Sequence, residues 1–282
     1  MRTILTLLIL IQTTIHLKAQ TSSEQFNKTK MEYKGDKATQ AKLLMRHVAI
    51  WGKITEVQAK LDTNFLKILS KKINITKTQV KKYIITNSII EEEVGGNIDS
   101  TTSSINVNGK KVNAKYFVIH DVSTPAFKNT FPANINDSTW SFNNSKIWAK
   151  KVTHTYVTRT GKCNTVTNFS EGLRATKFEL KVLGTISKGL FIHIELVQPR
   201  VFPPGNEDNA PVAPTPGFTN IQYQKLALLY ICASIRKGEW LVPAFHANID
   251  EKLSDSHDDP QNFETNKFTN QVISLITTLK TL

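Results

Sequence analysis

The sequence predicts an α/β fold in which a central mixed β-sheet is flanked by helices and preceded by a helical N-terminal extension. From Lys110 onward, short apolar runs that are typical of strands alternate with longer helical patterns. Before residue 95, apolar residues instead recur every three or four positions, the period of a helix with one buried face. Gly95 and Gly96, followed by a stretch rich in Ser and Thr, separate the two patterns. We therefore divide the chain into a basic helical N-terminal region (20–95) and a larger domain (96–282).

The first 19 residues have the composition of a secretory signal peptide. Arg2 supplies a positive charge, an apolar run follows over 4–11, and Ala19 is a small residue suited to cleavage. The apolar run is too short to span a bilayer, and an N-terminal anchor that stays uncleaved is the alternative. We expect an exported protein, either periplasmic or secreted.

Three helical segments are expected in the N-terminal region. The first follows a stripe of apolar residues over 43–57, and the second covers 61–73. The third, 76–85, opens with a capping box between Thr76 and Gln79. Lysines occupy the polar faces, so these helices either contact an anionic surface or serve only as structural cover. They form either a small accessory domain or a set of helices packed on the core of the larger domain.

Four strands and two helices are expected in the larger domain. Thr160 and Gly161 form the turn of a hairpin between the second and third strands, and Asn108 with Gly109 marks an earlier turn. Six prolines exclude regular structure over 198–217, a long loop of the kind that often forms the wall or lid of a site. The strands are 116–120, 153–159, 164–169 and 190–197, and the helices are 219–237, with Thr219 as N-cap, and one from about 263 or 266 to 279.

The charge balance restricts the partners. The chain carries a formal net charge of +13, which falls to about +11 once a signal peptide with Arg2 and Lys18 is removed. Such a balance favours an anionic cell wall or membrane surface as partner. Nucleic acid is not expected, because an exported chain rarely meets it and the sequence has no stripe of interleaved arginines and aromatic residues.

Two cysteines, Cys163 and Cys232, could pair in an oxidising compartment. Cys163 follows a turn glycine, whereas Cys232 lies within an apolar helical run. We favour two separate buried thiols over one disulfide, and neither cysteine has the sequence context of a catalytic nucleophile.

Two histidines and one aspartate are candidate ligands of a catalytic metal. An apolar run that is typical of a strand ends on His120, and His246 is followed thirteen residues later by Asp259. Imidazole nitrogens and a carboxylate oxygen suit zinc, and three protein ligands leave a fourth position open for water. Asp255 and Asp258 in the same loop leave the choice of carboxylate open.

Five short motifs follow one another between about residues 116 and 268. They are a strand ending at His120, His154 with Gly161, the strand Ile192-His193-Ile194-Glu195-Leu196, the helix start Phe218-Thr219 with Gln222, and His246 with Asp259-Pro260 and Phe263. Their order resembles that of the type-2 zinc-dependent N-acetylmuramoyl-L-alanine amidases, a family that also includes peptidoglycan recognition proteins. The resemblance does not cover the N-terminal region.

The resemblance implies a reaction and the residues that perform it. It implies that zinc is bound by His120, His246 and Asp259, and that Glu195 acts as general base. The reaction would be hydrolysis of the amide bond between N-acetylmuramic acid and L-alanine in peptidoglycan or in soluble muropeptides. Two other functions stay open, namely a non-catalytic peptidoglycan-binding module on the same fold and a zinc hydrolase of another amide. The oligomeric state is not predicted.

The chain departs from the family near the expected site. The family usually has a lysine two residues before the ligand aspartate, where it donates to the developing oxyanion, and this chain has His257 there. We favour His257 as the oxyanion donor, with a role as zinc ligand as the alternative. His193 stands where the family has a small residue, usually glycine, beside the expected base. His154 matches a family histidine that lines the site without binding the metal.

Overall fold

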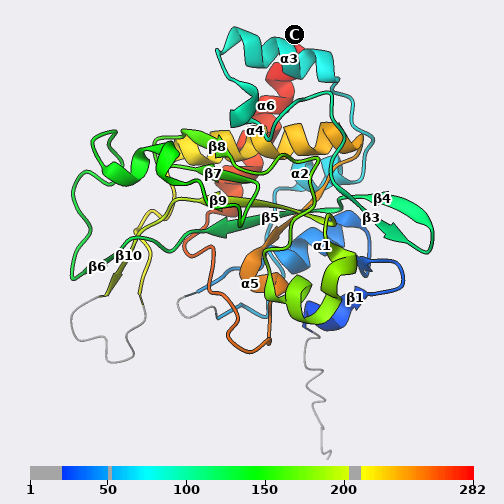
Figure 1. Cartoon of the computed structure of the whole chain (residues 1–282), viewed down its shortest axis with the longest axis horizontal. Helices are drawn as coiled ribbons and strands as arrows, with labels where there is room; N and C mark the ends of the chain where they lie inside the picture. The colour runs from blue at the N-terminus through cyan, green and yellow to red at the C-terminus, as the bar shows by residue number, and fades with distance from the viewer. Residues whose placement is uncertain (1–20, 50–52, 203–210) are drawn as a thin grey trace, which may run out of the picture.

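A five-stranded β-sheet crosses the centre of the molecule, as the computed structural model in Figure 1 shows. The structure describes residues 21–49, 53–202 and 211–282. Four of the strands run parallel and the edge strand β8 runs antiparallel. Helices lie on both faces, so the predicted α/β fold with a central mixed sheet flanked by helices is confirmed. In sheet order the strands are β11 (Val242–Phe245), β5 (Tyr116–Asp121), β9 (Phe191–Leu196), β7 (Thr155–Val157) and β8 (Cys163–Thr165).

The two central strands, β5 and β9, are buried along almost their whole length. Every residue of β5 is buried, and in β9 only Glu195 is partly exposed. Parallel strands covered on both faces read as continuous apolar runs, which explains why both were predicted within one residue of their ends. Strands β7 and β8 are shorter than predicted. Strand β11 was missed because it has only four residues and contains Pro243, which is tolerated since β11 is an edge strand.

Helix α4 (Asn220–Lys237) lies over one face of the sheet and packs against α6 (Thr265–Lys280). Both helices agree with the sequence prediction. Thr219 and Gln222 form a capping box at the start of α4, and Gly238 ends it in the left-handed conformation that glycine adopts without strain.

The opposite face of the sheet carries α1 (Lys37–Leu44) and the short helix α5 (His246–Ile249) (Figure 1). A small hairpin of β1 (Phe26–Asn27) and β2 (Glu32–Tyr33) lies on the same side. Tyr33 donates its backbone N–H to the hydroxyl of Tyr116 in β5, which attaches this hairpin to the sheet.

The N-terminal region packs on the same hydrophobic core as the sheet. Helix α2 (Thr63–Leu69) places Phe65 against Tyr230 of α4 and Phe268 of α6. Helix α3 (Lys77–Thr86) contacts α4 and α6, and it begins with the predicted capping box. The sequence left two arrangements open, and the structure shows the one in which the helices pack on the core of the larger domain.

The prediction of a helix along the apolar stripe 43–57 is wrong. Helix α1 ends at Leu44, and Val48 and Ile54 instead form an antiparallel bridge with each other. Their β-branched side chains favour extended backbone, which competes with continuation of the helix. Val57, another member of the stripe, is 69 % exposed. Trp51 of the same stripe lies outside the described residues.

The proline-rich segment 198–217 contains a short strand, contrary to the prediction of a loop without regular structure. Strand β10 (Arg200–Phe202) pairs in parallel with β6 (Ala126–Lys128). The three residues of β10 lie between two prolines and keep their own backbone N–H groups, so a short ladder is possible there. Residues 203–210 lie outside the described part of the chain.

The remaining elements among the described residues are short. Strands β3 (Ser104–Val107) and β4 (Lys110–Asn113) form a hairpin around the predicted Asn-Gly turn, whose two residues both have positive φ. Single 3₁₀ turns lie at Ser23–Gln25, Glu91–Glu93, Ser141–Asn143, Ser145–Ile147 and Gly184–Ser187, and a π-helical turn at Phe178–Leu183.

Three further expectations have different outcomes. Cys163 and Cys232 are buried and form no disulfide with each other, so the expectation of two separate thiols is confirmed. The predicted signal peptide, 1–19, lies outside the described residues. Within the described ranges, no helix has the length and apolar character needed to cross a bilayer.

A largely buried ion pair connects the N-terminal region to the segment that follows His246. Arg46 donates two hydrogen bonds to the carboxylate of Glu251, at 2.7 and 3.2 Å. The backbone N–H of Ser22 donates to the same carboxylate, and Asn248 donates to the carbonyl of Arg46. The side chains of Arg46 and Glu251 are 4 % and 14 % exposed. The N-terminal region thereby supports α5 and the residues that follow it.

Replacement of Glu251 by Ala tests this connection. Loss of one partner leaves the other charge buried and unpaired, so we expect the free energy of unfolding to fall by about 3 kcal/mol. Urea unfolding followed by circular dichroism measures it. Glu264→Ala removes a carboxylate whose ion pair with Lys267 is exposed, and should cost less than about 1 kcal/mol. Equal effects of the two substitutions would contradict the assignment.

Candidate metal centre

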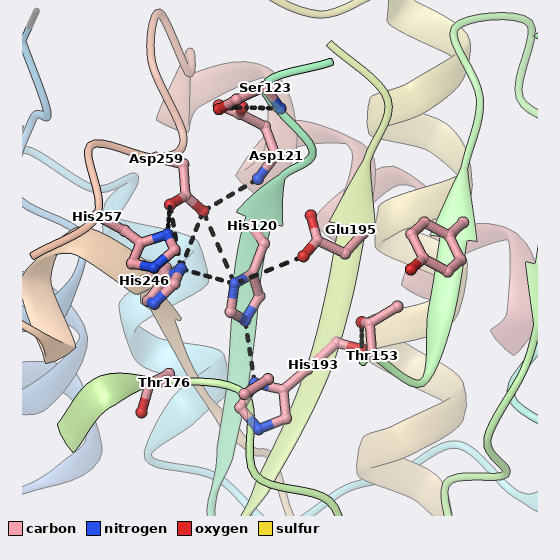
Figure 2. Close-up of polar contacts among 12 residues, drawn as sticks. His120, Asp121, Ser123, Thr153, Thr176, His193, Glu195, His246, His257 and Asp259 are labelled. Atoms are coloured by element: carbon pink, nitrogen blue, oxygen red, sulfur yellow. Dashed lines mark hydrogen bonds and ion pairs between the residues drawn. The ribbon is translucent and has the colours of Figure 1, made fainter. Parts of the chain in front are cut away.

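The register of the sheet brings four polar side chains into one row. Strand β11 pairs with β5 so that the next residue, His246, comes beside His120. His120 pairs with Glu195 on β9, and Glu195 pairs with Tyr156 on β7. The row lies at the carboxyl ends of the parallel strands, the edge where open α/β sheets bind their ligands. Figure 2 shows His120, His246 and Glu195 directed toward one another.

The loop between α5 and α6 returns to this row and adds Asp259 (Figure 2). The backbone N–H of Asp121 donates to Asp259 Oδ2 at 3.1 Å, and the carbonyl of Asp259 accepts from Ala247. The carboxylate of Asp121 is paired in turn with Arg200 at 2.8 Å, and both are buried. Asp259 is therefore fixed at both its backbone and its side chain.

The three predicted ligands form a buried group that could hold a metal ion. His120 Nδ1 lies 2.9 Å from His246 Nδ1, which lies 3.0 Å from Asp259 Oδ1. His120 Nδ1 also lies 3.7 Å from Asp259 Oδ2. Two ligand atoms that are each about 2.0–2.1 Å from a tetrahedral zinc lie about 3.3 Å apart. The observed separations lie on both sides of that value, so the spacing fits a small tetrahedral ion.

A hydrogen bond to Asp250 determines which nitrogen of His246 faces the centre. His246 Nε2 lies 2.9 Å from Asp250 Oδ2, and a carboxylate only accepts, so the proton is on Nε2. In the neutral ring the lone pair is then on Nδ1, which faces the other two ligands. Asp250 is held by the backbone N–H groups of Lys177 and Phe178. A carboxylate that orients a histidine in this way is a common support of metal ligands.

His120 is oriented by a second pair of buried side chains. Glu179 accepts from the backbone N–H groups of Ala175 and Thr176, and its Oε2 lies 3.1 Å from His193 Nε2. His193 Nε2 makes no hydrogen bond among the described residues, so this contact with Glu179 is a close approach only. His193 Nδ1 lies 3.0 Å from His120 Nε2, and a proton on His120 Nε2 that is donated to it leaves the lone pair of His120 Nδ1 directed at the centre. His193, which stands where the amidase family has a small residue, therefore helps to orient His120.

Three side chains with possible ligand atoms thus converge, and all three are buried. Burial, followed by the positive charge of His246, lowers the pKa of His120 well below its usual value. For His246, burial opposes the charged form, but Asp259 and Asp250 outweigh burial and raise the pKa to about 10. Burial also opposes the charge of Asp259, whereas His246 lowers the pKa of this carboxyl well below its usual range. The centre therefore requires one positive charge, which a proton on His246 or a bound cation can supply.

Glu195 borders the centre without belonging to the ligand group. Its Oε1 lies 4.0 Å from His120 Nδ1, and its side chain is 16 % exposed. Its other oxygen, Oε2, is buried and has no hydrogen-bond partner among the described residues. Burial, reinforced by Asp259, raises the pKa of Glu195 well above its usual value. A carboxyl group in this environment keeps its proton to a higher pH than an exposed carboxyl group does.

His257 lies at the rim of the centre. Its ring stacks on that of His246 with centroids 4.2 Å apart, and its side chain is half exposed. His257 Nδ1 lies 3.6 Å from Asp259 Oδ1, which is beyond hydrogen-bond distance. The group that could hold a metal ion includes Asp259 and does not include His257.

Other polar residues around the centre have structural roles. His154 is fully buried, its Nδ1 accepts from the backbone N–H of His193, and its Nε2 donates to the carbonyl of Glu171. Burial lowers the pKa of His154 to about 3, so this ring is neutral. Asp250 and Glu179 were missed by sequence reasoning. The four-residue spacing of His246 and Asp250 was the available signal for the first, and for Glu179 the sequence offers none.

Comparison with family models, with curated proteins and with solved structures found no match to this chain. The resemblance to the type-2 amidases therefore depends on the five sequence motifs alone.

Asp250→Asn tests the support of His246. Asparagine keeps the shape but removes the charge, and its amide group meets the N–H groups of Lys177 and Phe178. We expect affinity for zinc to fall about 10–100-fold, the usual effect of losing such a support. Competition with a chelator measures the affinity. Asp255→Asn is the matched control, since its carboxylate is 81 % exposed, and affinities that agree within twofold between the two variants would refute the role of Asp250.

Proposed function

We propose that the protein is an exported, zinc-dependent hydrolase that cleaves the amide bond between N-acetylmuramic acid and L-alanine in peptidoglycan. The observation that carries this proposal is the buried group of His120, His246 and Asp259 with Glu195 beside it. Two imidazoles and one carboxylate are a donor set of catalytic zinc sites with an open fourth position. The order of the five motifs favours this amide over others, and the basic chain suits an anionic cell wall.

The choice of zinc follows from the donors. Calcium and magnesium prefer ligand sets made of oxygen atoms, whereas here two of the three donors are imidazole nitrogens. The donor group contains neither Cys163 nor Cys232, so it offers no sulfur ligand. A bound zinc ion would supply a Lewis acid that polarises the amide carbonyl and acidifies a water molecule.

The residues of the chain would then move the protons. Glu195 accepts a proton from the water whose oxygen attacks the carbonyl carbon, and it returns that proton to the nitrogen as the C–N bond breaks. Its raised pKa suits this exchange because the carboxyl group must both accept and donate during one turnover. His257 at the rim donates a hydrogen bond to the carbonyl oxygen as that oxygen gains negative charge.

Digestion of purified peptidoglycan followed by mass spectrometry tests the function together with Glu195. The zinc-loaded protein should release stem peptides that begin with a free L-alanine amino group. Glu195→Gln should lower the rate by ~10²–10⁴-fold, because the amide keeps the shape but cannot accept the proton.

Zinc content should be the same in both proteins, since Glu195 lies outside the ligand group. Glu171→Gln, at a carboxylate remote from the ligands, serves as the control and should digest peptidoglycan at the original rate. Release of peptides cut at another amide would redirect the assignment to a different zinc hydrolase. Zinc retention without any cleavage would favour a peptidoglycan-binding module.

Substitutions of His257 separate its two possible roles. His257→Ala should retain zinc and lose activity by ~10²–10³-fold, the scale of one lost oxyanion donor. His257→Lys should restore much of that activity, because lysine supplies a positively charged donor. Zinc content and initial rates of the two variants are the measurements. Loss of zinc from His257→Ala, with retention in Asp259→Ala, would show that His257 is the ligand.

A further inference from the structure

A second polar cavity lies at the opposite end of the same strands. Tyr116 and Val242, the first residues of β5 and β11, line a cleft of about 650 Å³. His120 and His246 stand four residues further along these strands, so the cleft and the metal centre are roughly 13 Å apart along the sheet. The cleft shares no residue with the metal centre.

Lysines dominate the lining of this cleft. Five lysines face three carboxylates, which leaves two positive charges uncompensated. The carboxylates are already engaged, because one bonds to Lys115, one is shared by Lys37 and Lys237, and one caps helix α1. The lysines are Lys37, Lys71, Lys72, Lys115 and Lys237, and the carboxylates are those of Glu32, Asp36 and Glu239.

Two of these lysines have no ion-pair partner among the described residues. Lys71 and Lys72 follow α2 directly, are exposed, and also line a smaller adjoining cavity. A third cavity, of about 540 Å³, shares Lys115 and Lys237 with the cleft, and Lys111 adds a further positive charge there. The lysines of the cleft thus also line two neighbouring cavities.

Lys237 is the most deeply buried of the five, with 11 % of its side chain exposed. Burial, followed by repulsion from Lys37, lowers the pKa of Lys237 to about 8. Its nearest carboxylate, Glu239, lies 3.8 Å away and is also bound by Lys37 at 3.1 Å. An ammonium group that has lost water and shares its only counter-ion gains most from an additional anion.

We propose that this cleft binds a phosphate-bearing anion. Ammonium groups act as point charges toward phosphate oxygens, and several of them around one hollow suit a ligand with more than one negative charge. The volume is in the range of small-ligand sites. This inference is independent of the proposed hydrolase, because it uses none of the residues of the metal centre.

Calorimetric titration of the zinc-loaded protein with fructose 1,6-bisphosphate tests the site. This probe carries two phosphates and competes little for zinc. We expect saturable binding at one site, weakened at least about tenfold in the double variant Lys71→Glu/Lys72→Glu. The control Lys146→Glu/Lys151→Glu changes the charge equally at exposed positions that line neither the cleft nor the two neighbouring cavities, and should bind within about twofold of the original protein.

The source of the phosphate is distinguished by lipid vesicles. The cleft binds a lipid headgroup if the protein sediments with phosphatidylglycerol vesicles but not with phosphatidylcholine vesicles. In that case the Lys71/Lys72 double variant should no longer sediment with the phosphatidylglycerol vesicles. Binding of the soluble probe alone assigns the cleft to a free phosphate ester. Absence of saturable binding, equal weakening in both double variants, or equal binding of succinate would overturn the proposal.

Discussion

The structure depends on a close approach of two buried imidazole nitrogens beside a carboxylate. His120 Nδ1 and His246 Nδ1 lie 2.9 Å apart in a buried space, and Asp259 adds a carboxylate beside them. Such an arrangement is unfavourable unless a positive charge lies between the donors. Hydrogen bonds to Asp250 and to His193 hold the outer nitrogens of His246 and His120, so both rings keep Nδ1 directed at the centre. The electrostatics of the centre therefore favour a positive charge between the donors, supplied by a proton on His246 or by a bound cation.

The fold supplies this arrangement through parallel register. Strands β11 and β5 run in the same direction, so their last residues deliver His120 and His246 to the same edge, and β9 adds Glu195 to the row. The helices on both faces exclude water from the strands but leave this edge to the loops. The ion pair of Arg46 with Glu251 holds the loop after α5 against the N-terminal region. One end of the sheet thus carries the candidate metal centre, and the other end carries the lysine-lined cleft.

Sequence patterns predicted the parts of the molecule where one local signal dominates. Continuous apolar runs identified β5 and β9, and capping residues identified the starts of α3 and α4. The helix predicted from the apolar spacing over 43–57 is not observed, because apolar side chains can be buried from an irregular backbone as well as from a helix. The ligand residues His120, His246 and Asp259 were selected by their order, and the structure brings them together. Asp250 and Glu179 were missed, and Glu179 could not have been found because it approaches His193 only through the tertiary fold.

X-ray absorption at the zinc edge of the zinc-loaded protein tests most directly whether these donors converge on one ion. The account predicts four nitrogen or oxygen ligands at about 2.0–2.1 Å, with multiple scattering from two imidazole rings. A first shell of six oxygen atoms, or one without imidazole scattering, would contradict it.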